Sequence, residues 1–166
     1  MGILKRLRGT PICRHEEPYK LCFSATAPYE IVSNIDVDFQ TTQAVKRFAR
    51  YWDMIANSGR FKQTMLLFNA DDLFHQFARL SEWLYEQTGR THRIALNRLF
   101  DFMYQAMTEL FSIESKFVKR ALEEDFLAGG FKGSPKFLLD ETTHHQARVA
   151  ADAAGHTRRQ RSHRLN

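Results

Sequence analysis

The stretch IALNRLFDFMYQAMTELF, residues 94–111, decides the fold class of this sequence. Its apolar residues recur every three or four positions, which is the period of an amphipathic α-helix and not of a strand. The stripe consists of Ile94, Leu96, Leu99, Phe100, Met103, Met107 and Leu110, with Phe102 and Phe111 at its margins. The sequence therefore predicts a helix over residues 92–110, whose Phe- and Met-rich face packs into a core.

Similar spacing predicts helices before this stretch. One is expected over residues 39–56, with Asp38 as its N-cap, and another over residues 71–87. A shorter amphipathic run covers residues 61–68. Between the first helix and this run, Gly59 can take the positive φ that ends a helix.

After the central stretch, the spacing predicts one more helix and then a change of character. The helix is expected over residues 113–127, with Ser112 as its cap. Residues 135–139 are expected to be extended. Four or five helices joined by short loops indicate a mainly α fold, an antiparallel bundle or array of helices.

The ends of the chain differ from its middle. Residues 1–35 contain two strand-like pieces, around residues 2–8 and 29–32, but too few for a sheet of their own. Residues 141–166 are polar and rich in His and Arg, and we expect them to be weakly ordered. The predicted organisation is therefore a short extended N-terminal segment (1–35), a helical domain (36–140) and a basic polar tail (141–166).

Composition and charge limit the classes of function. The chain of 166 residues is 43% hydrophobic, which suits one domain with a core. Its net charge is +5, but the excess of Lys and Arg lies at the two ends. A small basic nucleic-acid-binding module is therefore the alternative function, although the neutral middle counts against it. No stretch has the ~20 apolar residues of a membrane span. Together with two cysteines taken as reduced thiols, this leads us to expect a cytoplasmic protein.

The chain is poor in residues arranged for catalysis. It has no phosphate-binding glycine loop, nucleophile elbow or two-His metal helix. His144 and His145 are adjacent, so a helix would point them about 100° apart. A small independent enzyme would need His75, His92 or an acidic group such as residues 123–125 to cluster in one buried pocket, and the sequence gives no reason to expect this.

Three short pieces, in this order, resemble cobalamin-binding radical SAM proteins. ILKRLRGTP (residues 3–11) resembles the end of the radical SAM barrel, where the last strand runs into a Gly-Thr-Pro turn. APYEI (27–31) resembles the segment that follows, and NSGRF (57–61) is similar to a turn in the helical domain of unknown function that closes many of those proteins. The terminal RQRSH (159–163) is similar to the end of that family. The motif positions are Gly9, Thr10, Pro11, Pro28, Tyr29, Glu30, Asn57, Ser58, Gly59 and Phe61.

The resemblance implies a non-catalytic C-terminal accessory domain or fragment of such an enzyme, which braces the barrel or contributes to substrate binding. Residues 1–35 would then be the last barrel strand and a linker. The partners would be the barrel and the cobalamin-binding domain of the parent protein. The family holds its 4Fe–4S cluster with a Cys-x-x-x-Cys-x-x-Cys loop, which Cys13 and Cys22 do not form. We therefore expect no catalytic, cofactor-binding or metal-binding residue here, and the cluster, S-adenosylmethionine and cobalamin only in the parent protein.

Overall fold

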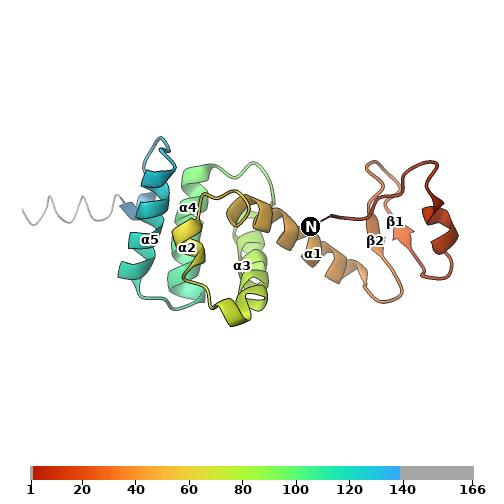
Figure 1. Ribbon diagram of the computed structural model, residues 1–166, viewed down its shortest axis with the longest axis horizontal. Coiled ribbons are helices and arrows are strands. Elements are labelled where there is room, and N and C mark those ends of the chain that lie inside the picture. The colour runs from red at the N-terminus through yellow and green to blue at the C-terminus, as the bar shows by residue number, and fades with distance from the viewer. Residues whose placement is uncertain (1, 139–166) are drawn as a thin grey trace, which may run out of the picture. The chain divides into compact units, whose positions relative to one another are not determined.

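The computed structural model describes residues 2–138 and confirms a mainly helical protein with a short extended N-terminal part (Figure 1). The chain divides into two compact units, residues 1–93 and the residues from Ile94 onward. The predicted tail over residues 141–166, including His144 and His145, lies outside the described residues. The domain boundaries expected from the sequence stay a prediction.

The N-terminal part is held by short elements. A 3-10 helix, η1 (Pro11–His15), is followed by strands β1 (Cys22–Phe23) and β2 (Ile31–Ser33), which pair antiparallel. The predicted strand over residues 2–8 is reduced to one bridge, in which Lys5 pairs with Glu30. Residues 2–8, called the N-terminal segment from here on, therefore have a hydrogen-bonded neighbour along one edge.

The helices of the first unit follow the local sequence closely. Helix α1 (Phe39–Ile55) begins as predicted, because the Asp38 carboxylate accepts a hydrogen bond of 2.7 Å from the Thr41 N–H. This bond lowers the pKa of Asp38. Three further elements complete the unit: α2 (Lys62–Met65), η2 (Ala70–Asp72) and α3 (Leu73–Thr88). Gly89 ends α3 in the left-handed conformation.

The core of the first unit lies between α1, α2 and α3. Its fully buried large side chains are Tyr51, Ile55, Phe61, Phe77, Leu80 and Leu84. Tyr51 can be buried in this core because its hydroxyl donates a hydrogen bond to the Arg90 carbonyl, 2.9 Å away. Beside the core, Phe48 and Trp52 stack with ring centroids 5.6 Å apart.

The second unit contains α4 (Leu96–Gln105), η3 (Ala106–Leu110) and α5 (Ser115–Ala128). The predicted helix start at residue 92 is wrong, because Arg93 has φ +56° and cannot continue into a right-handed helix. The α-helix also ends early, since η3 is a π-helical turn in which the Phe111 N–H bonds the Ala106 carbonyl. The predicted cap at Ser112 is also wrong, because α5 begins at Ser115 with Glu114 at its N-cap position and Ser112 has φ +54°.

The last described residues contradict one more prediction. Residues 136–138, expected to be extended, form a helical turn. Asp101 on α4 explains the difference, because one of its carboxylate oxygens accepts from the N–H of Lys136 (2.6 Å) and of Phe137 (3.4 Å). The buried Phe137 ring stacks on Tyr104, with centroids 5.4 Å apart. A cap from a distant residue and aromatic packing together fold this segment.

Candidate functional site

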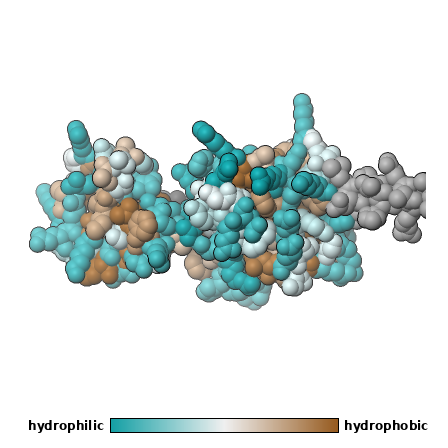
Figure 2. Space-filling model, turned by 180° about the vertical axis from the view of Figure 1, so that it is seen from behind, coloured by the Kyte–Doolittle hydropathy of each residue, from teal (hydrophilic) through white to brown (hydrophobic). Residues whose placement is uncertain are grey.

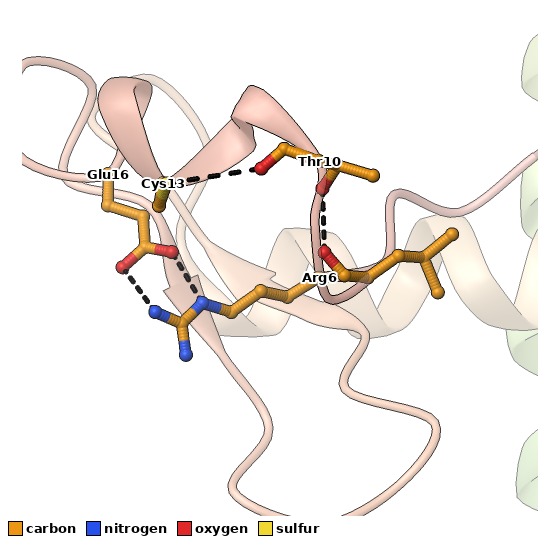
Figure 3. A network of polar contacts seen from close by, with 5 residues as sticks. Arg6, Thr10, Cys13 and Glu16 are labelled. Carbon is orange, nitrogen blue, oxygen red and sulfur yellow. Dashed lines mark hydrogen bonds and ion pairs between the residues drawn. The ribbon is translucent and has the colours of Figure 1, made fainter.

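The Gly9-Thr10-Pro11 motif forms a turn that leads from the N-terminal segment into η1 (Figure 3). Gly9 has φ +80°, which suits glycine. The Thr10 hydroxyl donates to the Leu7 carbonyl over 2.7 Å, and Pro11 occupies the first position of η1. The motif is therefore a turn in which the Thr10 hydroxyl is hydrogen-bonded to the preceding backbone.

A double hydrogen bond fixes the segment against η1. The Arg6 guanidinium donates to both carboxylate oxygens of Glu16, and the Cys13 thiol lies 3.9 Å from the Thr10 carbonyl (Figure 3). A shallow depression of about 400 Å³ lies beside this contact. It is lined by Arg6, Leu7, Arg8, Gly9, Thr10, Ile12, Cys13 and Tyr29.

The Pro28-Tyr29-Glu30 motif lies against the same segment. The Tyr29 carbonyl accepts from the Arg6 N–H at 2.9 Å, and the Ile31 N–H donates to the Leu4 carbonyl at 2.9 Å. These two bonds flank the Lys5–Glu30 pair, so its side chains lie on one side and form an ion pair of 4.0 Å. The structure thus brings the first two motifs together.

The third motif, residues 57–61, shapes the loop after α1. Asn57 donates to the Asp53 carboxylate over 2.7 Å, the Ser58 hydroxyl donates to the Ile55 carbonyl over 3.2 Å, and Gly59 has φ +69°. Phe61 is fully buried. These residues end a helix and anchor a loop, and none of them lines the depression beside the first two motifs.

The N-terminal part exposes its apolar side chains. None of residues 2–41 is buried, and Figure 2 shows brown apolar atoms at the surface of this part, on the left of the view. Six large apolar residues in this range are at least two-fifths exposed: Leu4, Leu7, Tyr19, Tyr29, Ile35 and Phe39. A stretch of this length with no buried side chain and several exposed apolar ones is typical of a surface that is covered by a partner.

A second feature is a polar groove of about 700 Å³ between the N-terminal segment and α1. The polar part of its wall on α1 consists of Gln43, Lys46, Arg47, Arg50 and Asp53. Their spacing of three and four residues places them on one face of the helix. Gly2, Ile3, Lys5, Glu30, Ala49, Tyr85 and Thr91 complete the lining. Sequence reasoning missed this groove, although the polar spacing along α1 was a usable signal.

Four basic side chains line the groove, and three of them have a carboxylate partner. Lys46 lies 3.0 Å from Glu30, which also faces Lys5. Arg47 binds both oxygens of Glu82 and lies over the Tyr85 ring, 4.8 Å from its centroid. Arg50 is exposed, and within the described residues no carboxylate pairs with it.

The candidate bases His75 and His92 are both exposed, so neither lies in a buried pocket. His75 bonds Asp72 over 2.8 Å with its ring largely exposed, and His92 is exposed in a loop. Over residues 2–138, no group of three His, Cys, Asp or Glu side chains could hold a metal ion. The two cysteines of the chain are free and exposed. They do not fit the three-thiolate loop that a radical SAM cluster requires.

The fold and these surfaces define a mainly helical domain with an exposed, partly extended N-terminal part. The chain belongs to the family described as "Protein of unknown function (DUF4080)", which matches residues 17–165. Neither curated proteins nor solved structures gave a match. No helix in the described part of the chain is long and apolar enough to cross a membrane.

Proposed function

We propose that this chain is a non-catalytic C-terminal accessory domain of a cobalamin-binding radical SAM enzyme, and that its N-terminal part docks on the radical SAM barrel. The family match over residues 17–165 includes the second and third pieces of the resemblance and begins after the first, residues 3–11. This division supports the interpretation of residues 3–11 as barrel sequence that precedes the helical domain.

The observation that carries the proposal is the lack of any buried residue over residues 2–41. Ordering a chain costs about 1–2 kcal/mol per residue in backbone entropy, and burial of apolar side chains is the main term that offsets it. Here Leu7 is 59% exposed and Ile35 is 55% exposed. A barrel that covers these side chains would supply the missing apolar contact.

The free edge of the N-terminal segment supports the same partner. In an antiparallel bridge flanked by hydrogen bonds, the N–H and C=O of the central residue point away from the paired strand. Lys5 is that residue, and its N–H has no hydrogen-bond partner within residues 2–138. An open edge of this kind accepts another strand, and the last strand of a barrel would pair there with its neighbour.

A binding experiment tests the proposal. The polypeptide encoded directly upstream of this chain would be expressed separately and mixed with it, and association measured by analytical ultracentrifugation. We expect an upstream barrel with a three-cysteine loop and a 1:1 complex with it. Leu7→Asp should weaken the complex by about tenfold or more, since it places a charge in an apolar contact.

Phe117→Asp is the matched control, because Phe117 is 52% exposed on α5 in the other unit. It should leave association unchanged. An upstream sequence without a radical SAM barrel, or a complex equally sensitive to both variants, would contradict the proposal.

A small nucleic-acid-binding module is the second candidate, and the basic face of α1 favours it. Phosphate contacts from Lys46, Arg47 and Arg50 would give affinity that falls steeply as salt rises. The basic tail, Arg158 to Arg164, lies outside the described residues. Sub-micromolar binding of an oligonucleotide at physiological salt, retained after deletion of residues 156–166 and weakened as salt rises further, would favour this candidate over the accessory domain.

A further inference from the structure

The charge arrangement in the groove between the N-terminal segment and α1 points to a ligand. Lys5 enters it from the segment, and Lys46 and Arg50 from successive turns of α1. We propose that this groove binds a small organic phosphate, with Arg50 as the primary contact to the phosphate. The inference does not depend on the proposed docking function.

Charge balance identifies Arg50 as the contact. Glu30 accepts from Lys46 at 3.0 Å and faces Lys5 at 4.0 Å, and Glu82 accepts from Arg47. Asp53, the other carboxylate in the lining, lies three residues beyond Arg50 and accepts from Asn57 over 2.7 Å. Arg50 is left, within the described chain, as the lining cation without a carboxylate partner. The four lining cations exceed the three carboxylates Glu30, Glu82 and Asp53 by one charge, so an anion in the groove would meet an unpaired guanidinium.

The donors favour phosphate over a carboxylate. A guanidinium offers five N–H donors, and Lys46 and Lys5 add ammonium groups that approach from two different elements. A planar carboxylate has two oxygens in one plane, whereas a phosphate monoester presents three oxygens in a tetrahedral arrangement. Donors from two elements can satisfy three such oxygens at once.

The size and the remaining lining favour a small ligand with an organic body. A volume of about 700 Å³ falls within the range of ligand pockets, about 300–1,000 Å³. Ile3 and Ala49 give the lining an apolar component, and Gln43 and Thr91 add neutral polar groups. Glu82 and Tyr85 hold the Arg47 guanidinium from two sides, so this wall is organised before a ligand binds.

Titration calorimetry on the full chain tests the proposal. The probes are inorganic phosphate, glucose 6-phosphate and adenosine monophosphate, with glucose and adenosine as uncharged counterparts. We expect an organic phosphate to bind and its counterpart not to bind. Arg50→Gln should weaken binding by about tenfold or more, since it removes a charge-assisted hydrogen bond.

Arg120→Gln is the matched control, because Arg120 is an exposed arginine on α5 whose partner is Glu124 at 2.9 Å. It should bind the phosphates as the wild type does. Circular dichroism would verify that Arg50→Gln folds, as expected for an exposed side chain.

Three results would overturn the proposal. The first is no binding of any phosphate probe at millimolar concentration. The second is equal weakening by Arg50→Gln and Arg120→Gln, which would indicate general charge attraction. The third is tight binding of a single-stranded oligonucleotide, sensitive to Arg50→Gln, without binding of the small phosphates. In that case the groove is part of a nucleic-acid interface.

Discussion

At Gly59 the backbone passes through the left-handed region, with φ +69°, directly after the turn that closes α1. A β-carbon there would meet only the Lys62 Cε, at 3.5 Å, so space is available and the backbone conformation alone opposes a side chain. Gly59→Ala should therefore lower the free energy of unfolding by about 1 kcal/mol, measured by urea denaturation. Gly2→Ala is the control, since Gly2 has open space and no positive φ. Equal stability of the two variants would contradict this account.

Tyr51 is fully buried, and its hydroxyl lies 2.9 Å from the Arg90 carbonyl and 3.2 Å from the Thr88 hydroxyl. Tyr51→Phe keeps the ring and removes these bonds, so we expect a loss of about 1 kcal/mol at neutral pH. Burial raises the pKa of Tyr51 above its ordinary value of 10.0.

The direction of this pKa shift sets a pH dependence. Because the folded pKa is the higher one, the stability that Tyr51 contributes is fully present below pH 10 and is lost as the pH rises through the folded value. The stability difference between wild type and Tyr51→Phe should therefore shrink above pH 10, in urea titrations at several pH values. A constant difference would show that the pKa of Tyr51 is the same in the folded and unfolded states, contrary to this account.

Among the elements, the helical turn at residues 136–138 depends on a side chain from α4. Asp101 bonds the N–H groups of Lys136 and Phe137, and Phe137 stacks on Tyr104. Asp101→Ala removes this cap, and we expect a loss of about 1 kcal/mol together with faster amide exchange at residues 136–138. Glu109→Ala, on an exposed position of η3, is the control. Unchanged exchange at these residues would indicate that the aromatic stack alone holds the turn.

At the scale of the whole molecule, buried side chains begin only at Thr42. We therefore expect residues 2–38 to exchange their amide protons faster than residues 39–127, because local opening of this part exposes no core. A chain that begins at Ser33 should retain its helical circular dichroism. Hydrogen exchange on both chains is the measurement. Slow exchange at residues 2–8, or failure of the shorter chain to fold, would show that the N-terminal part belongs to the core of this domain.

The local sequence determined the helical class, the cap at Asp38 and the helix end at Gly89, because each depends on residues within one or two helical turns. It also carried the motif turns at residues 9–11 and 57–61. The exposed apolar surface of the N-terminal part was not predictable, since it requires knowing which apolar residues remain uncovered in the folded chain.

Only the tertiary structure decided the remaining features. Arg93 and Ser112 adopt positive φ values, and η3 takes π-helical hydrogen bonds, against the simple period of their sequences. Asp101 caps a turn that lies 35 positions along the chain. Lys5 and Arg50, which are also far apart in the sequence, line the same groove. Local propensities are weak compared with packing and long-range hydrogen bonds, so a contact between distant residues, such as the Asp101 cap, can override them.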